Sequence, residues 1–403
     1  MKTTISNPID RTSVYICAGL VSAGGALLLN VLPLLFGALS ERYGFGENQL
    51  GSLAMAMNLG FGVLGLASLL WIRRVSWRVI SLSASVLVVA ALLCMLTDPP
   101  YETLLMVMAL AGAGTGALYA LAMTIFGDSV QPERAFGFKL GMETIPGAIL
   151  LTLLPVAVAP LWGFQGMIVT LAIAMVLMGV VPLPWVPRRS QRVSQVLTGP
   201  EPTVAAENRV IVWLSLIASL VFLTGIMSVW AFLELLGKKT GLSSDTIGAV
   251  LGVGFVINAG SGFVASSIGL KAGRFLPLAV VVCAEVAGLV MLGQFASLTT
   301  YVIGAMCMLF SISFVLAYTF GLMAEFDLSG KLVALGALCL SIGAAVGPAV
   351  GGLLIEAYGY PAVLLFSGAC SVSVLLIYGA AVLKAQQSKK TDNPEASVVM
   401  PRT

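Results

Sequence analysis

Histidine does not occur anywhere in the 403 residues of the chain. Its absence excludes imidazole metal sites, Ser/His/Asp catalytic triads and histidine proton relays. Charged residues are scarce too, at 10% of the chain, against roughly 25% in soluble domains. All six cysteines lie in apolar runs, and none has the spacing of a disulfide framework or a metal site. The sequence therefore predicts no metal, no cofactor and no enzymatic activity.

Long polar segments are also missing, and apolar sequence takes their place. Hydrophobic residues make up 59% of the chain, above the roughly 45–50% of soluble domains. A bilayer core about 30 Å thick requires roughly 20 apolar residues per helix, and runs of that length recur throughout. We expect an all-α membrane protein with twelve transmembrane helices, near residues 14–38, 48–72, 79–97, 103–126, 136–159, 164–186, 210–234, 245–268, 275–296, 300–323, 332–355 and 361–383. The first run is too long for a cleaved leader, so we expect it to be retained.

Basic residues in the loops predict the orientation of these helices. Of the 21 Lys and Arg residues, only Arg42, Lys238 and Lys239 fall on the side opposite the two termini. Because cytoplasmic loops carry the excess of Lys and Arg, both termini are predicted to be cytoplasmic, with the protein in the inner membrane. The net charge of +3 is then a signal of topology and not of a nucleic-acid surface.

The chain repeats itself at a spacing of 197 residues. A shift of this size lays RYGFGENQLG (residues 42–51) on KTGLSSDTIG (residues 239–248), with Gly44 on Gly241. One nearly constant offset indicates two parallel halves of six spans each. We expect an N-terminal half at 1–187, a cytoplasmic linker at 188–208, a C-terminal half at 209–385 and a disordered cytoplasmic tail at 386–403.

Three short stretches are similar to known family motifs. ASLLWIRRVSWR (residues 67–78) follows the outline of the loop signature Gly-x-Leu-Ala-Asp-Arg-x-Gly-Arg-Arg, with Arg73 in place of the Asp, and GLKAGRF (residues 269–275) keeps its Gly and Arg. SIGAAVGPAVGG (residues 341–352) looks like the glycine-proline motif of closely packed gating helices. Together with the two six-span halves, these stretches make the chain resemble the major facilitator superfamily. The resemblance implies that family's fold and transport by alternating access, with gating-helix packing at Gly347, Pro348, Gly351 and Gly352.

Charged residues gather at the predicted cytoplasmic ends of spans 2 to 5. In the superfamily this neighbourhood latches the cytoplasmic side in the outward-facing state. The resemblance therefore implies a cytoplasmic gate, with Asp128 able to replace the missing loop acid. Its residues are Arg73, Arg74, Arg78, Asp128, Arg134 and Lys139.

Glu143 stands out because it lies inside an apolar span, one helical turn beyond Lys139. At about 1.5 Å per residue from Phe136, Glu143 lies roughly 10 Å below the boundary and Lys139 about 5 Å, so Lys139 is expected to reach back to water. Intramembrane acids are functional candidates by default. Two interpretations stay open: Glu143 faces a central cavity and exchanges a proton, or it forms a structural i,i+4 ion pair with Lys139.

Glu285 is a second intramembrane acid, about 16 Å deep by the same count from Arg274. The short loop between the two spans brings Asn258 to the same depth, so we expect a protonated Glu285 hydrogen-bonded to Asn258. Trp230, like three other tryptophans near span ends, is expected to anchor the membrane interface. Asn30, Asn58, Tyr119 and Tyr318 are further candidates for the proton-coupling or substrate site.

These features predict a secondary transporter of a small organic solute. The few polar residues within the spans favour an amphiphilic or aromatic cargo. We expect coupling to protons through Glu143, with efflux by antiport favoured and uptake by symport as the alternative. A non-transporting membrane receptor or assembly factor is the alternative from another class. The expected partners are the solute, protons and the lipid bilayer, and the protein is expected to be a monomer that binds no nucleic acid.

Overall fold

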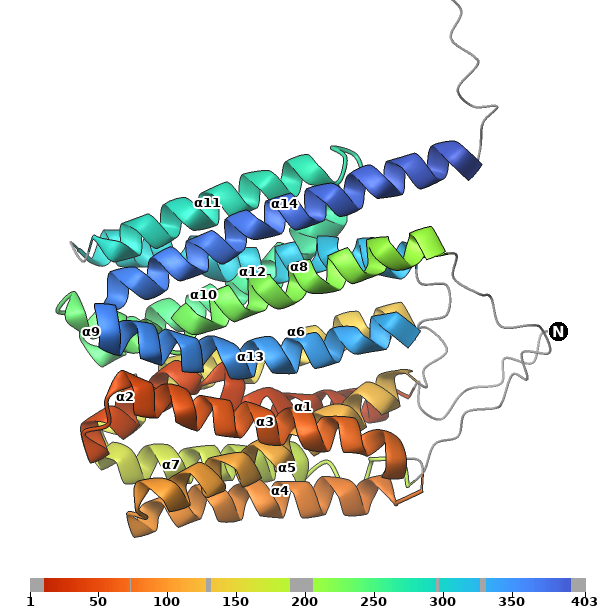
Figure 1. Cartoon of the computed structure of the whole chain (residues 1–403). Helices are drawn as coiled ribbons and strands as arrows, with labels where there is room; N and C mark the ends of the chain where they lie inside the picture. The colour runs from red at the N-terminus through yellow and green to blue at the C-terminus, as the bar shows by residue number, and fades with distance from the viewer. Residues whose placement is uncertain are drawn as a thin grey trace, which may run out of the picture.

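The computed structural model describes residues 11–72, 74–127, 132–188, 206–294, 297–326 and 331–392, and these contain helices and no strand. The helices are α1 (Thr12–Asn30), α2 (Leu32–Tyr43), α3 (Glu47–Trp71), α4 (Trp77–Cys94), η2 (Met95–Thr97), α5 (Tyr101–Gly127), α6 (Pro132–Leu153), η3 (Leu154–Val158), α7 (Ala159–Gly179), α8 (Ala206–Trp230), α9 (Leu233–Lys239), α10 (Ser244–Ile268), α11 (Phe275–Gly293), α12 (Leu298–Phe326), α13 (Lys331–Tyr358) and α14 (Tyr360–Asp392). They lie roughly side by side in one bundle (Figure 1).

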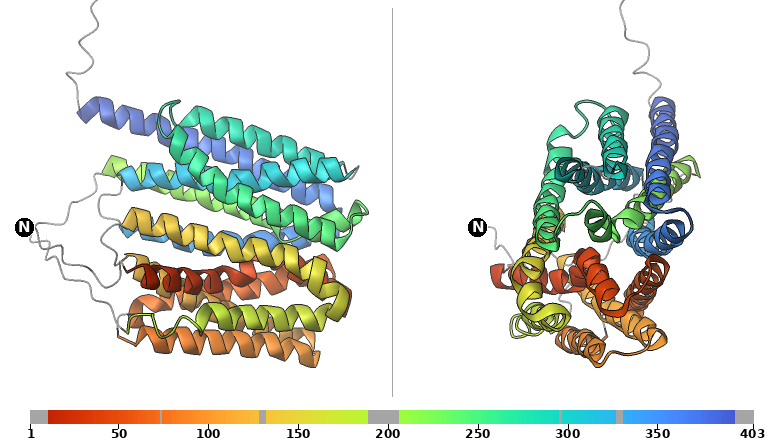
Figure 2. Two further views of the ribbon diagram at one scale, coloured as in Figure 1. Left: turned by 180° about the vertical axis from the view of Figure 1, so that it is seen from behind. Right: turned by 90° about the vertical axis from the view of Figure 1, so that its left-hand side faces the viewer.

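Twelve passes of the chain arise from eleven continuous apolar stretches. Ten of these stretches are single passes, whereas Gly141–Gly179 is one helical run of 39 residues. Within that run Gly163 lies at φ 55° and ψ −148°, a backbone conformation that only glycine adopts readily. The chain reverses direction there, so α6 and most of α7 run in opposite directions (Figure 2), and both pack against α1. The predicted spans 5 and 6 are therefore two passes joined by a tight turn.

The two halves share the same irregularities. Span 1 breaks between α1 and α2 at Val31 (φ −100°, ψ 9°), and span 7 breaks between α8 and α9 at Phe232 (φ −105°, ψ 9°). After the short helix that follows each break, α2 or α9, the chain turns at Gly44 (φ 70°) and Gly241 (φ 80°). These glycines are the pair that the 197-residue shift aligns, so the sequence repeat is also a repeat of backbone structure.

Contacts between the halves include those of α3 with α13, of α6 and η3 with α10, and of α2 with α9. Figure 1 shows α3 and α13 as neighbours at the centre of the bundle, with α2 and α9 near one end. We call this the odd-loop end, because it holds the turns after spans 1, 3, 5, 7, 9 and 11. The opposite end, with the loops after even-numbered spans, is the even-loop end.

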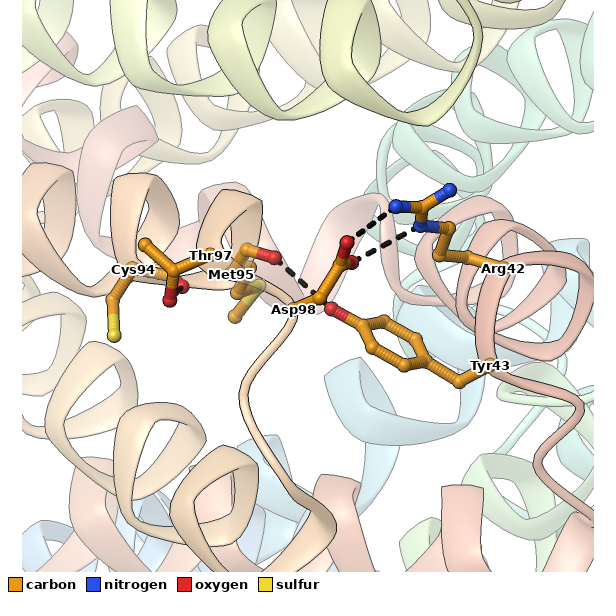
Figure 3. A network of polar contacts seen from close by, with 6 residues as sticks. All are labelled: Arg42, Tyr43, Cys94, Met95, Thr97 and Asp98. Atoms are coloured by element: carbon orange, nitrogen blue, oxygen red, sulfur yellow. Dashed lines mark hydrogen bonds and ion pairs between the residues drawn. The ribbon is translucent and has the colours of Figure 1, made fainter.

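The odd-loop end of the N-terminal half is tied together by a small polar network (Figure 3). Arg42 at the end of α2 forms an ion pair with Asp98, and the Tyr43 hydroxyl donates to the Met95 carbonyl oxygen at 3.0 Å. The Arg42 guanidinium lowers the pKa of the Asp98 carboxyl through a hydrogen bond and its positive charge. The loop after span 1 is thereby fastened to the loop after span 3.

Three predicted boundaries differ clearly from the structure. Helix α14 continues to Asp392, so residues 386–392 of the predicted disordered tail are helical. Helix α8 begins at Ala206, inside the predicted linker. It ends at Trp230, before the predicted limit of span 7 at residue 234. Residues 189–205 of the linker and 393–403 of the tail lie outside the described residues.

Candidate functional site

Lys139 and Glu143 form an ion pair in the interior of the N-terminal half. Both lie on α6, and they are only 1% and 9% exposed. The Ser22 hydroxyl on α1 donates to the same carboxylate oxygen, Oε1, that accepts from Lys139. The expectation that Lys139 reaches back to water is wrong, because its ammonium is held below the surface by the carboxylate.

The aromatic ring of Tyr119 on α5 covers the other side of this ammonium. Lys139 Nζ lies 3.9 Å from the ring centroid, a cation–π distance. Helix α1 approaches α5 closely here, since a Cβ on Gly25 would lie 2.6 Å from the Tyr119 amide nitrogen. A larger residue than glycine at position 25 would push the two helices apart. The buried charge pair is therefore enclosed by α1, α5 and α6.

Asn30, at the last position of α1, extends the site toward the other half of the protein. Its Nδ2 donates to the backbone carbonyl of Glu143 at 3.2 Å. A Cβ on Gly147, one turn after Glu143, would lie 3.1 Å from Asn30 Nδ2 and 3.2 Å from Phe255 Cε1 on α10. The charge pair therefore lies about one helical turn from the contact between the halves.

Trp230 closes this border from the C-terminal half. Its indole Nε1 donates to the Leu29 carbonyl oxygen at 3.2 Å, and its ring lies 5.3 Å from that of Phe255. Trp230 is 3% exposed. The prediction that it anchors the membrane interface is wrong, since α8 carries it into the contact with α1.

The two candidates Glu285 and Asn258 do not pair with each other. Glu285 is fully buried and accepts a hydrogen bond from the Ser371 hydroxyl on α14 at 2.7 Å. Asn258 Oδ1 accepts from the Ser313 amide at 3.1 Å and the Ser313 hydroxyl at 2.6 Å, across to α12. The predicted Glu285–Asn258 hydrogen bond is wrong, because α10 and α11 follow each other in the chain but both pack against α12 and not closely against each other.

Asn58 and Tyr318 also stand apart from the buried charge pair. Asn58 Nδ2 donates to the Ala54 carbonyl oxygen at 2.9 Å within α3. The Tyr318 hydroxyl donates to the Gly269 carbonyl oxygen at 2.9 Å, joining α12 to the end of α10. Of the seven residues predicted for coupling or substrate binding, the structure brings together Glu143, Asn30 and Tyr119.

The predicted cytoplasmic gate is described only in part. Arg78 Nε donates to the Val186 carbonyl oxygen at 2.8 Å, and its Nη2 donates to that of Pro184 at 2.7 Å, so it ties span 3 to the chain after span 6. Arg74 is exposed. Lys139 belongs to the buried pair. Arg73, Asp128 and the side chain of Arg134 lie outside the described residues.

The glycines of α13 lie where this helix crosses two others. A Cβ on Gly347 would lie 2.7 Å from the Thr224 carbonyl oxygen, and one on Gly351 would lie 2.6 Å from that of Ser228, both on α8. Gly352 faces α3 of the other half, where its Cβ would lie 3.0 Å from Asn48 Cα. Pro348 lies inside the helix between these contacts. The motif therefore packs α13 closely against both halves.

Sequence reasoning missed a second charged group, which joins the halves at the odd-loop end. Lys238 on α9 lies 2.8 Å from Glu234 Oε1 and 2.7 Å from Glu41 Oε1 on α2. Two signals could have found it. Glu234 and Lys238 are four residues apart, and Glu41 and Lys238 are separated by 197 residues, the repeat spacing.

Two parallel halves of six transmembrane helices, packed around buried charges near their contact, define the fold as that of a membrane transporter of the alternating-access type. The family model of the Major Facilitator Superfamily matches residues 14–329. The chain belongs to that superfamily and is an integral membrane transporter.

One solved structure with this fold is that of a bacterial homolog of the human lysosomal transporter Spinster, in an inward-facing and unoccupied conformation. It matches with a TM-score of 0.64 and 14% sequence identity, over 92% of this chain and 94% of the other. Among curated proteins no sequence match was found.

Proposed function

We propose that this transporter is proton-coupled, with Glu143 as the coupling carboxylate, and that it exports a small amphiphilic or aromatic organic solute. The observation that carries the proposal is the buried Lys139–Glu143 pair, one turn from the contact between the halves. Its position supports proton exchange over a purely structural i,i+4 pair, because a relative movement of the halves changes the surroundings of Glu143.

Protonation of Glu143 has a large effect on this arrangement. A proton on the carboxylate removes the counter-ion of Lys139, whose ammonium is 1% exposed. Leaving a buried charge without its partner costs about 3–5 kcal/mol, and the Tyr119 ring offsets only about 2 kcal/mol of that. A shift between 1:99 and 99:1 needs about 5.5 kcal/mol. Proton binding can therefore supply a substantial part of the free energy that moves the helices.

The contacts between the halves support a state that is closed at the odd-loop end. They include the Glu41–Lys238 ion pair and the hydrogen bond from the Tyr360 hydroxyl to Glu47 Oε1 at 3.3 Å. The distribution of Lys and Arg assigns this end to the outside and both termini to the cytoplasm. In this assignment the protein is inward-facing.

The aromatic residues at the border support the cargo class. Tyr119 and Phe61 lie 5.5 Å apart between ring centroids in the N-terminal half, and Trp230 and Phe255 lie 5.3 Å apart in the other. Flat apolar rings beside the Glu143 carboxylate suit an aromatic cation that competes with Lys139 for it. Efflux by antiport follows, because a cation and a proton can compete for the same carboxylate.

The test is ethidium uptake into everted membrane vesicles driven by an imposed pH gradient. The wild-type protein should accumulate this aromatic cation, and Glu143→Gln should abolish accumulation while leaving exchange of ethidium across the membrane. Glu285→Gln is the matched control, since it makes the same substitution at a buried acid in the other half. If Glu143→Gln keeps the gradient dependence of the wild type, the carboxylate is structural and the proposal is wrong.

A further inference from the structure

The Glu41–Lys238–Glu234 cluster brings equivalent positions of the two halves into contact. Glu41 and Lys238 are equivalent positions of the repeat, and so are Gly37 and Glu234, which are also in contact. A Cβ on Gly37 would lie 2.8 Å from Glu234 Oε2. The carboxylate of Glu234 therefore sits directly on the backbone of α2, in space that exists only because residue 37 is glycine.

Glu234 is 3% exposed, although it lies on α9, beyond the membrane span Arg209–Trp230. Its Oε1 pairs with Lys238 at 2.8 Å and lies 3.5 Å from the Ser244 hydroxyl. Its Oε2 is buried, and no hydrogen-bond donor among the described residues reaches it. An ionised oxygen in that position loses its hydration without replacement, whereas a protonated one carries no charge to solvate.

We propose that Glu234 is a proton-binding site at the odd-loop end, which is occupied when that end is closed and vacated when it opens. This inference rests on one part of the proposed function, namely that the protein alternates between a state open at one end and a state open at the other. It does not depend on Glu143. Opening separates α9 from α2, exposes the carboxylate to water and removes the reason for its protonation. Closure of this end therefore takes up a proton.

The charges around Glu234 change its pKa in opposite directions. Burial raises the pKa of the Glu234 carboxyl to about 7, while Lys238 opposes the rise and Glu41 adds to it. Tyr301 on α12 also faces this region, and its hydroxyl donates to the Leu233 carbonyl oxygen at 2.9 Å. Lys238 is shared between two acids, so it neutralises Glu234 only in part.

The direction of the pH effect follows from these pKa values. In the open state the hydrated carboxyl has an ordinary pKa of about 4.3, lower than in the closed state. The state with the higher pKa is favoured by protons, so closure is strongest at low pH and weakens as pH rises toward about 7. Between the pKa of the open state and that of the closed state, the closed-to-open ratio should change about tenfold per pH unit.

The experiment measures the distance between two spin labels across the odd-loop end. Cysteines replace the exposed Thr103 on α5 and Thr299 on α12, in a background without the six native cysteines. Double electron–electron resonance in nanodiscs between pH 5 and 8 then gives the closed fraction. The closed fraction should rise as pH falls, and a fraction independent of pH overturns the proposal.

Variants separate proton binding from a merely structural role. Glu234→Gln mimics the protonated acid and should give a closed fraction that is high and independent of pH. Lys238→Gln should move the midpoint up by about one pH unit, since an opposite charge is lost. Glu41→Gln, at an exposed side chain, should move it down. Midpoints that do not move, or move in the opposite directions, contradict the assignment even if Glu234→Gln fails to fold.

Glu143→Gln distinguishes this inference from the proposed function. If Glu234 is the site, Glu143→Gln keeps the pH dependence of the label distance while it loses gradient-driven ethidium uptake. Loss of the pH-dependent distance in Glu143→Gln, together with its retention in Glu234→Gln, would assign the proton to the α6 site and overturn the inference.

Discussion

Replacing Gly352 with alanine should open the odd-loop end of the protein. Gly352 lies on α13 at its contact with the start of α3 in the other half, and its Cβ would lie 3.0 Å from both Asn48 Cα and the Glu47 carbonyl carbon. Carbon atoms pack best at about 3.5–4.0 Å, so the helices must separate by about 0.5–1 Å. The partner atoms are backbone, which cannot rotate away.

The magnitude follows from the cost of overpacking. Inserting a methyl group into a packed contact costs about 1–3 kcal/mol. This strain acts on the closed arrangement of the two halves and is relieved when they part. Since each 1.4 kcal/mol is tenfold, the closed-to-open ratio should fall by about 5-fold to 150-fold. The Thr103–Thr299 label distance at pH 5, where closure is strongest, measures this ratio.

Two other glycines provide matched controls. Gly65 on α3 has no atom within 4 Å of its Cβ position, so Gly65→Ala should leave the ratio unchanged. Gly112 on α5 packs against α3 within one half, with its Cβ 3.0 Å from Met57 Cα. Gly112→Ala should lower the melting temperature without changing the ratio. The reasoning is refuted if Gly352→Ala and Gly65→Ala give the same label distances.

Three further predictions concern other parts of the chain. Glu285→Leu should lose about 0.6–2 kcal/mol of stability by removing the partner of a buried hydroxyl, whereas Glu285→Gln should keep the melting temperature of the wild type. The Arg42–Asp98 ion pair should protect its loops from hydrogen exchange at neutral pH. Because Asp98 has a lowered pKa, this protection should be lost only as pH falls below the ordinary range of Asp. A cysteine at Ser243 should react with an impermeant reagent only from outside the cell, and one at Ala272 only from the cytoplasm.

Each of these predictions has an outcome that contradicts it. Equal melting temperatures of the Glu285→Leu and wild-type proteins would show that the hydrogen bond does not stabilise the fold. If Asp98→Asn keeps wild-type loop protection at neutral pH and loses it only at low pH, the ion pair does not protect the loops from hydrogen exchange. Labelling of the two cysteines from the opposite sides would reverse the orientation and assign the Glu234 site to the cytoplasm.

The apolar pattern carried most of the information on the fold. Hydrophobic length alone predicted the helices, because a bilayer leaves no other way to satisfy the backbone. The 197-residue repeat predicted that the chain consists of two similar halves, and Gly44 and Gly241 have the same backbone conformation. The break at Val31 was not predicted, because the apolar run continues through it, although Pro33 cannot donate to the Leu29 carbonyl oxygen four residues earlier.

The burial of the polar side chains and their hydrogen-bond partners could not be predicted from the apolar pattern. Hydropathy and helical rise give the depth of a residue but not the helix face that carries it or the neighbour that it meets. The Lys139–Glu143 pair was one of two open interpretations, because both residues lie on one helix, where an i,i+4 spacing fixes their distance. Asn258 and Glu285 lie on different helices, and the neighbours of those helices, α12 and α14, supply their partners, Ser313 and Ser371.

The sequence by itself determined that the protein lies in a lipid bilayer, how many times the chain crosses it, and that the chain has two similar halves. These features depend on composition and on spacing along the chain. The tertiary structure decided which charges became sites. Nothing in the sequence distinguishes Glu41 from Glu234. The packing of α2 on α9 leaves Glu41 exposed, whereas Glu234 lies against Gly37 and is only 3% exposed. A carboxylate binds a proton more readily when burial removes its hydrating water, and only the packing of the helices determines which carboxylate is buried.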